Sequence, residues 1–182
     1  YELAAELADF RGDELLVDLY CGAGTIGLSM AGKVRELVGV EIVPDAVENA
    51  RENARNCGAV NARFLCADAK EAAAQLAREG LRPVVVDPPR KGCDSEVLRA
   101  IAQMGPERLI YISCNSASLA RDCKELAALG YRLEVAAPVD LFPRTAHVET
   151  VVLLSKLKVD HHIEIELKMD ELDLTAAESN LR

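Results

Sequence analysis

Short apolar runs alternate with segments of helical period along most of the chain. Near-continuous apolar strands separated by helices are typical of a parallel sheet that is covered on both faces. The pattern therefore predicts a doubly wound α/β fold with seven strands and with helices between the first six. The expected strands lie in residues 14–20, 36–42, 62–68, 82–89, 108–114, 131–142 and 147–156.

The connection between the sixth and seventh strands is shorter than the dozen or so residues that a parallel crossover requires. We therefore expect an antiparallel last strand that begins beside the carboxyl ends of the parallel strands. Open α/β sheets bind their ligands at that edge. Glu149 begins the last strand and should reach it. Side chains that end other strands are expected there too: Asp18, Glu41, Asp87 and Cys114.

Length and composition favour one main domain in residues 1–156 and an appended segment in residues 157–182. Half of the 182 residues are hydrophobic, which allows a sizeable core. No apolar run approaches the roughly 18 residues that span a bilayer, and no signal peptide is visible. The six cysteines lack zinc-site spacing, and His161 and His162 lack partner ligands. We expect a cytoplasmic protein with reduced thiols, no metal and no membrane contact.

The formal charge of −9 argues against a chain that clamps nucleic acid by itself. Non-specific affinity for nucleic acid comes from Lys and Arg side chains that neutralise phosphates. A long polyanion would therefore need further contacts from outside this chain.

A glycine-rich loop follows the first strand. Gly22, Gly24 and Gly27 fit G-x-G-x-x-G, so a dinucleotide-binding domain is a real competitor. Glycines let the backbone approach a ligand, although a plain strand-to-helix turn uses them too. Asp18 favours S-adenosylmethionine, because a carboxylate before the glycines opposes a pyrophosphate but can hold the ammonium of a methionine moiety.

Two further acids end neighbouring strands. Glu41 could accept both ribose hydroxyls of an adenosine ligand of either class. Asp68 could receive the adenine amino group, but it could equally cap the helix that follows. These acids support an adenosine ligand without choosing its class.

A stiff acidic loop, DPPRKG, ends the fourth strand. Its prolines cannot continue the ladder, so they hold Asp87 at the sheet edge, although a simple turn would look the same. Arg90 and Lys91 could meet a phosphate backbone or be a solvated pair. Many amino-directed nucleic-acid methyltransferases have an aromatic residue where Arg90 stands, so a carbon target is favoured over an exocyclic amine.

Methylation of carbon 5 of a pyrimidine needs three groups on one face. This carbon is a weak nucleophile until a thiolate adds to carbon 6, and a base must then remove the carbon-5 proton before the thiol leaves. Cys114 ends the fifth strand before a helix whose dipole favours a thiolate. With Glu149 as the base and the acidic pocket for the methyl donor, the set is complete.

The other cysteines include rivals. Cysteine is one of the most buried residue types, and this structural role suits Cys57, Cys66 and Cys123. Cys21 and Cys93 lie in loops near the expected pocket, so their position does not exclude them. Cys93 is the main rival to Cys114 as nucleophile.

Five stretches together resemble the catalytic domain of bacterial RNA (uracil-5-)-methyltransferases, especially those acting on 23S ribosomal RNA. They are DLYCGAGTIGLSMA, GVEIVPDAVENARENA, VVVDPPRKGCD, YISCNSASLARD and PVDLFPRTAHVETVVLL. The likeness covers residues 1 to about 156, and its last three motifs are specific. It implies a Rossmann-like methyltransferase that uses S-adenosyl-L-methionine to make 5-methyluridine in RNA.

The resemblance also implies roles for single residues. Cys114 would be the nucleophile and Glu149 the base. Contacts with S-adenosylmethionine are implied at Tyr20, Thr25, Glu41, Asp68 and Asp87. Without the resemblance, Tyr20 is a loop aromatic residue and Thr25 a helix N-cap.

The chain also departs from the family pattern. Arg144 stands where the family usually has Gln, and residues 116–118 replace a common Pro-Ala-Thr. Arg144 could change how an RNA loop is held, so it joins Arg90 and Lys91 as a candidate RNA contact. The family's upstream glutamine, substrate-contacting region and RNA-binding β-barrel have no counterpart in this chain, so we expect upstream domains to contribute to RNA binding.

The leading hypothesis is therefore an RNA uridine-5 methyltransferase that acts on 23S rRNA through a covalent Cys114 adduct. A transfer-RNA target is the nearest alternative. A nicotinamide-dependent oxidoreductase and a non-catalytic cofactor-binding module are alternatives from other classes.

Overall fold

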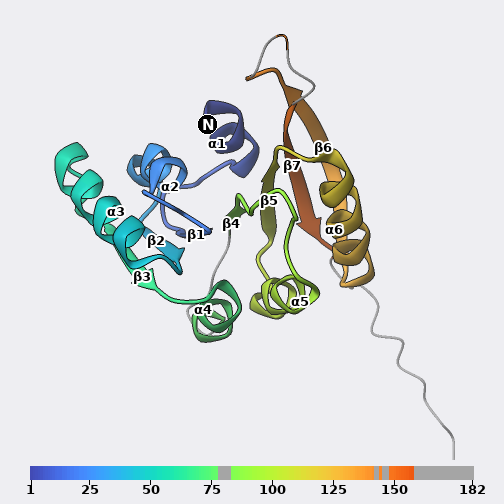
Figure 1. Ribbon diagram of the computed structural model, residues 1–182, viewed down its shortest axis with the longest axis horizontal. Coiled ribbons are helices and arrows are strands. Elements are labelled where there is room, and N and C mark those ends of the chain that lie inside the picture. Colours follow the sequence, from blue (N-terminus) through green and yellow to red (C-terminus); the bar gives the residue numbers. More distant parts are fainter. Residues whose placement is uncertain (78–82, 142–143, 145–147, 158–182) are drawn as a thin grey trace, which may run out of the picture.

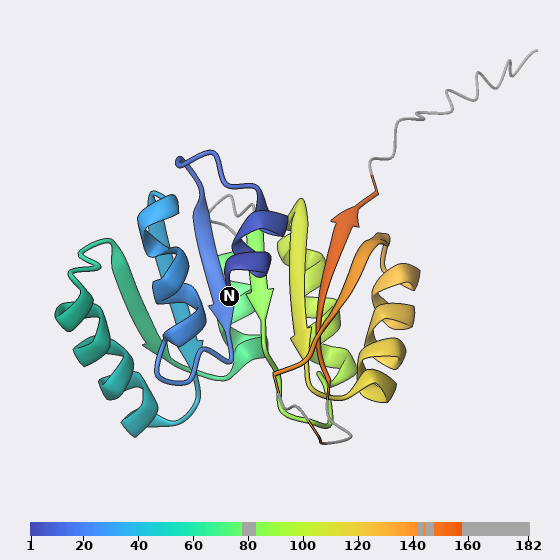
Figure 2. The same cartoon turned by 90° about the horizontal axis from the view of Figure 1, so that it is seen from above.

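A computed structural model describes residues 1–77, 83–141, 144 and 148–157. Its seven strands form one sheet in the order β3-β2-β1-β4-β5-β7-β6, with helices packed on both faces (Figures 1 and 2). The strands are β1 Leu15–Leu19, β2 Glu36–Glu41, β3 Ala62–Cys66, β4 Pro83–Val86, β5 Arg108–Ser113, β6 Tyr131–Val139 and β7 Glu149–Lys156. The helices are α1 Glu2–Ala8, α2 Thr25–Met30, the 3-10 helix η1 Ala31–Lys33, α3 Pro44–Cys57, α4 Ala69–Leu76, α5 Ser95–Met104 and α6 Ser116–Ala128.

Strands β1 to β5 pair in parallel, whereas β7 runs antiparallel to both β5 and β6. The predicted fold class and the reversed last strand are confirmed. The short β6–β7 connection explains the reversal, because it leaves no room for a crossover helix. The predicted features of residues 158–182, including His161 and His162, lie outside the described residues.

The alternation of side chains along each strand divides the core into two main layers. In β1, Val17 belongs to the layer that contains apolar side chains of α4, α5 and α6, while its neighbour Leu16 belongs to the layer that contains those of α1 and α2. A smaller cluster joins α3 to Phe64 of β3. The central strands are therefore buried on both faces, which is why their sequences are almost continuously apolar.

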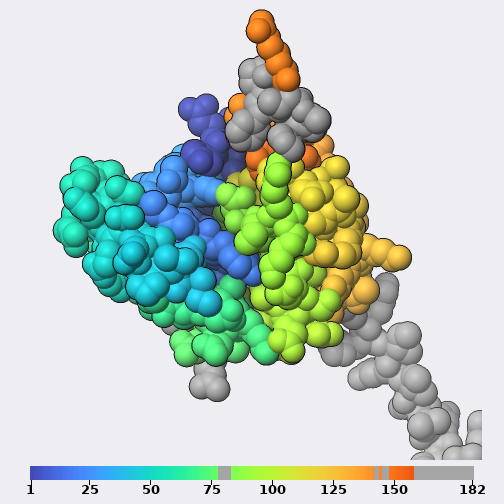
Figure 3. All heavy atoms as spheres, viewed as in Figure 1, coloured from blue at the N-terminus to red at the C-terminus, as the bar shows by residue number. Residues whose placement is uncertain are grey.

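The sheet has β3 at one end and β6 at the other. In the space-filling view, α3 lies to the left and α6 to the right (Figure 3). Strand β1 is central, and its carboxyl end meets the carboxyl ends of β2 and β4. No helix within the described part of the chain is long and apolar enough to cross a membrane.

Candidate active site

The register of β5 and β7 brings the proposed nucleophile and base together. Ser113, the last residue of β5, pairs with Thr150 of β7. Cys114 follows Ser113 and Glu149 precedes Thr150, so both residues directly adjoin the last pair of this ladder, at the same end of the two strands. The proposed nucleophile and base therefore belong to the same edge of the sheet.

Cys114 lies between this strand end and a capped helix. The backbone N–H of Asn115 donates to Ser113 Oγ at 3.1 Å. The Asn115 side chain in turn accepts from the backbone N–H groups of Ala117 and Ser118 at the start of α6. Asn is a preferred N-cap residue, so this cap could have been found in the sequence, but Asn115 was not among the predicted site residues.

The structure separates the three thiols near this edge by their exposure. Cys21 and Cys93 are buried, with 8% and 3% of their surface exposed, whereas Cys114 is half-buried. Burial raises the pKa of both buried thiols, that of Cys93 to about 12. A thiolate at neutral pH is therefore strongly disfavoured at Cys93.

The expectation of buried structural roles for the other cysteines is partly wrong. Cys57 and Cys66 are exposed, and Cys123 is half-buried. Cys57 is the last residue of α3, and Cys66 ends β3 at the edge of the sheet. At these ends too little of the fold covers the side chains.

The glycines of the loop after β1 serve different purposes. Gly22 has a φ of 53°, and apart from its own chain neighbours no described atom lies within 4 Å of the place where a Cβ would be. Gly24, with a φ of 82°, is the N-cap of α2. A Cβ on Gly27 would lie 2.8 Å from Leu37 Cδ1 and 2.9 Å from Asp18 Oδ2. Gly22 thus leaves open space, whereas Gly27 permits close packing of α2 on the sheet.

Thr25 is not the N-cap that the sequence alone suggested. It is the first residue of α2, its neighbour Gly24 occupies the cap position without a side-chain cap, and Thr25 is exposed. The positive φ of Gly24 explains the shift, because a left-handed residue at that point is best supplied by glycine.

Asp18 is fully buried beneath this loop. Its Oδ2 accepts a hydrogen bond from the backbone N–H of Gly27 at 2.9 Å, while Oδ1 has no partner among the described residues. Burial raises the pKa of Asp18 to about 7, against the lowering effect of the Gly27 bond, and the charges of Asp87 and Glu41 raise it further. An unpartnered buried oxygen is costly, so this carboxylate suits a cationic group at the edge.

Glu41 connects the glycine loop to the end of β2. Its carboxylate accepts from the backbone N–H of Gly22 at 3.1 Å and from that of Val43 at 2.9 Å. Beside it, Ile42 and Val43 are 61% and 50% exposed. This apolar surface next to an acid was missed from the sequence, although the order Glu-Ile-Val at a strand end was visible.

Asp68 caps a helix, as one of the two sequence interpretations proposed. It is the N-cap of α4, and its side chain accepts from the backbone N–H of Lys70 at 2.9 Å. The position after β3 still places it on the same edge as Glu41.

Tyr20 has an unusual backbone. Its φ is 64°, a left-handed value that non-glycine residues rarely adopt, and such strain often accompanies functional sites. Its half-buried side chain contacts the thiol of Cys93. Tyr20 therefore connects the glycine loop with the loop that follows Asp87.

Asp87 and Glu149 are electrostatically coupled. Burial raises the pKa of Asp87 to about 6, and the charge of Glu149 contributes to the rise. Burial also raises the pKa of Glu149. The two carboxyl groups are therefore close enough to influence each other, so the end of β4 and the start of β7 belong to one site.

The candidate RNA contacts lie on the surface. Arg90 and Lys91 are exposed in the loop after Asp87, where Lys91 forms an ion pair with Asp94 at 3.2 Å. Arg144 is exposed and has a φ of 70°. The loop places Arg90 and Lys91 three and four residues after Asp87.

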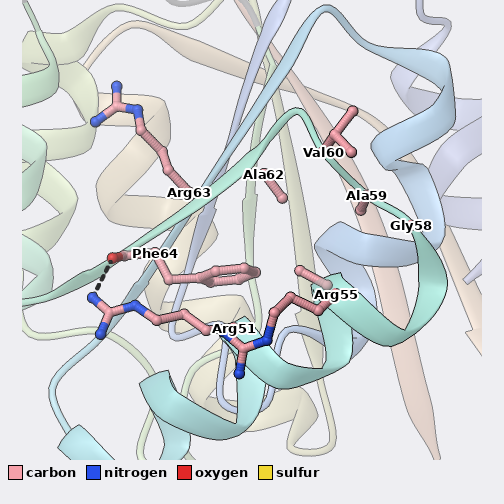
Figure 4. A pocket seen from close by; sticks show the side chains of 9 residues that line it. Arg51, Arg55, Gly58, Ala59, Val60, Ala62, Arg63 and Phe64 are labelled. Carbon is pink, nitrogen blue, oxygen red and sulfur yellow. Dashed lines mark hydrogen bonds between the residues drawn. The ribbon is translucent and has the colours of Figure 1, made fainter.

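A groove of about 560 Å³ lies elsewhere, between the C-terminal half of α3 and the start of β3 (Figure 4). Arg51 and Arg55 line it, and Arg51 donates to the carbonyl of Phe64 at 3.1 Å. Because it lies at the amino end of β3, this groove is separate from the edge that carries Cys114. Among the described residues, no three His, Cys, Asp or Glu side chains are grouped to hold a metal ion.

Comparison with known proteins decides the family of the chain. Residues 1–157 match the model of the family described as tRNA (Uracil-5-)-methyltransferase. The chain belongs to this tRNA (uracil-5-)-methyltransferase family. An uncharacterized RNA methyltransferase of Clostridium tetani is 45% identical over 157 residues, which are 85% of this chain and 34% of that protein. The chain thus spans about a third of the length of this relative.

Solved structures agree with the uracil-5-methyltransferase family and with its fold. The tRNA (uracil-54, C5)-methyltransferase of Pyrococcus abyssi, crystallised with S-adenosyl-L-homocysteine, is 32% identical with a TM-score of 0.71, over 84% of this chain and 37% of that one. A precorrin-6y C5,15-methyltransferase of Geobacter metallireducens has a TM-score of 0.70 at 14% identity, over 85% of each chain, and shows the fold alone. Family membership leaves no support for the nicotinamide-dependent oxidoreductase considered from the glycine loop.

Proposed function

We propose that the intact protein transfers a methyl group from S-adenosyl-L-methionine to carbon 5 of a uridine in RNA. The observation that supports this proposal is the β5–β7 register, in which Ser113 pairs with Thr150, so that Cys114 and Glu149 adjoin the same end of the ladder. Residues 1–156 would form the catalytic domain, and membership of the uracil-5-methyltransferase family supports the reaction class. The activity would belong to the cytoplasm.

The residues at the edge fit S-adenosylmethionine. The unpartnered oxygen of Asp18 suits the ammonium group, and the open space at Gly22 allows a close approach to the backbone. Glu41 would accept the ribose hydroxyls, while the exposed Ile42 offers the adenine an apolar surface and Asp68 an acceptor. The remaining contacts are proposed at Tyr20, Gly24, Thr25 and Asp87. When bound, S-adenosylmethionine supplies the methyl group that carbon 5 accepts.

The chain's own residues would activate the uracil ring for methylation and then release the product. The Cys114 thiolate adds to carbon 6, and the electron pair of the 5,6 double bond is delocalised as an enolate that makes carbon 5 nucleophilic. After methylation, Glu149 takes the carbon-5 proton, the double bond re-forms, and the carbon–sulfur bond breaks to regenerate the thiolate. The uridine must be unpaired or flipped for these groups to reach it.

The target RNA is proposed to be 23S rRNA, on the resemblance of the motifs around Cys114 and Glu149. Transfer RNA is the second candidate, because the matching family and the Pyrococcus abyssi enzyme are both named for it. Arg90, Lys91 and Arg144 would contact the RNA backbone, together with regions outside this chain. A map of 5-methyluridine in rRNA and tRNA from cells lacking the gene separates the two, since the lost site identifies the target.

The proposed mechanism is tested with the intact protein and RNA that contains 5-fluorouridine. Fluorine cannot leave as a proton does, so the wild-type protein should accumulate a covalent complex in the presence of S-adenosylmethionine. Cys114→Ala should form none, while Cys93→Ala, which removes a buried thiol, should still form it. A complex with Cys114→Ala would show that the nucleophile is wrongly assigned.

A further inference from the structure

A second buried carboxylate lies behind the proposed site. Asp122 of α6 is completely buried, and its Oδ2 accepts from the backbone N–H of Cys93 at 2.7 Å and from the Tyr111 hydroxyl. Its Oδ1 accepts from Nε and Nη2 of Arg121 at 2.8 and 2.6 Å. Four donors from three parts of the chain thus meet on one side chain.

Side chains of α6 also hold the backbone of the loop that follows Asp87. Arg121 Nη2 donates to the carbonyl of Lys91 at 2.8 Å and to that of Cys93 at 3.2 Å. Ser118 Oγ donates to the carbonyl of Arg90 at 3.0 Å. Together with the Asp122 bond, these contacts fix the loop at successive peptide groups.

The loop can approach Asp122 because Gly92 has no side chain. Its φ is 80°, and a Cβ there would overlap the carboxylate of Asp122 and lie 2.7 Å from Arg121 Nη2. A glycine at position 92 therefore allows the loop to pack directly on α6.

Both flanks of this contact carry proposed site residues. Residues 88–93 directly follow Asp87, while α6 follows Cys114, and Tyr111 lies on the strand that ends just before Cys114. Tyr111 and Tyr20 also both approach the Cys93 thiol, so the glycine loop is connected to the same group. Asp122 thus joins the segments that carry Asp87 and Cys114 without lying among the reacting groups.

We propose that Asp122 is a positioning residue, whose carboxylate sets loop 88–93 on α6 and thereby fixes Asp87 relative to Cys114. An apolar side chain could fill the same volume without desolvating a charge, so stability alone does not explain a buried carboxylate here. The four hydrogen bonds that Asp122 accepts instead fix the position of the loop relative to α6. This inference rests on the proposed function, because it concerns how that site is assembled.

Asp122→Asn in the intact protein tests the inference. The amide has the same volume as the carboxyl group, but one accepting oxygen is replaced by an NH2 group, which faces the N–H and O–H donors that Asp122 now binds. The rate of covalent trapping on 5-fluorouridine RNA is measured at saturating RNA and divided by the number of S-adenosylmethionine sites found by calorimetry. We expect this rate to fall about 10- to 100-fold, since a displacement of about 1 Å can cost roughly 100-fold. The half-saturating RNA concentration should change little.

A matched control is Glu125→Gln, which lies on the same helix but accepts from Ser95 Oγ of α5 at 2.8 Å and not from the loop. It should keep the wild-type rate. A role in stability only would lower the number of binding sites and leave the rate per site unchanged. That result, or an equal fall in Glu125→Gln, overturns the inference.

Two further measurements keep the test decisive. If Asp122→Asn does not fold, Arg121→Lys is used in its place, because Arg121 is an exposed partner of the same carboxylate. A wild-type rate of covalent trapping per binding site in Arg121→Lys overturns the inference. If the wild-type protein itself forms no covalent complex, the proposed function has failed. Hydrogen exchange at the Cys93 amide then tests the contact between the loop and Asp122. It is measured in Asp122→Asn or, where that variant does not fold, in Arg121→Lys. Faster exchange than in the wild-type protein supports the contact, and unchanged exchange overturns it.

Discussion

The side of the sheet edge formed by β1 and β2 holds its groups differently from the side formed by β5 and β7. Around β1, Asp18 accepts a hydrogen bond from the backbone N–H of Gly27. Glu41 accepts from the backbone N–H groups of Gly22 and Val43. Around β5, Cys114 and Glu149 come to the same end of the sheet only through the register of a reversed strand, in which Ser113 pairs with Thr150. The first arrangement is built around one glycine loop, whereas the second depends on the pairing of two strands that lie far apart in the sequence.

The largest effect on the first side is expected from Gly27→Ala. The new Cβ would lie 2.8 Å from Leu37 Cδ1 and 2.9 Å from Asp18 Oδ2, so α2 must move from the sheet. Overpacking of this kind lowers the free energy of unfolding by about 1 to 3 kcal/mol. Gly32→Ala is the control, because apart from its chain neighbours and the nearby helix backbone no described atom lies within 4 Å of its Cβ position. Urea unfolding should separate the two variants, and equal midpoints would refute tight packing at Gly27.

The pH dependence of cofactor binding tests the cationic role of Asp18. The pKa of its carboxyl is raised to about 7, so the folded protein keeps a proton that the unfolded chain loses near pH 4. Asp18 therefore makes the protein without added ligand less stable as the pH rises from about 4 to about 7. A ligand ammonium that requires ionised Asp18 should bind about tenfold more tightly at pH 8 than at pH 6.

Calorimetry with S-adenosylhomocysteine at the two pH values measures this difference. Asp18→Asn should bind more weakly and lose the dependence. A pH dependence that is unchanged in Asp18→Asn would assign it to another group, of which Asp87 is the first to examine because burial and Glu149 raise its pKa to about 6.

A smaller effect is expected on the second side from Asn115→Ala. Removing the side chain that caps α6 should lower the free energy of unfolding by about 1 kcal/mol. Ser116→Ala, at the exposed first position of the helix, is the control. If the cap also holds Cys114, trapping per folded protein should fall in Asn115→Ala only. Equal stability of the two variants would contradict the cap.

The features of the fold that depend on hydrophobic periodicity and on the length of connections could be predicted from the sequence. The seven strands, the reversed β7 and the shared edge for Asp18, Asp87 and Glu149 all follow from such patterns. Exposure was harder to predict, and Cys57 and Cys66 were wrongly expected to be buried, because burial at the end of an element depends on what packs there.

The network around Asp122 could not be predicted for a related reason. Its carboxylate bonds Cys93, which is 29 positions earlier in the chain, and nothing in the local pattern of α6 distinguishes this acid from an exposed one. The cap of Asn115, by contrast, is local and was available to a closer inspection of the sequence. Long-range polar contacts therefore require the folded structure.

The shared action of Cys114 and Glu149 on one uridine is tested most directly with Glu149→Gln, S-adenosylmethionine and ordinary uridine RNA. Without the base, the carbon-5 proton stays, so the carbon–sulfur bond cannot break. Mass spectrometry of the digested protein should find a methylated RNA adduct on Cys114, and the double variant Glu149→Gln, Cys114→Ala should give none. An adduct on another cysteine, or unchanged turnover without an adduct, would contradict the account.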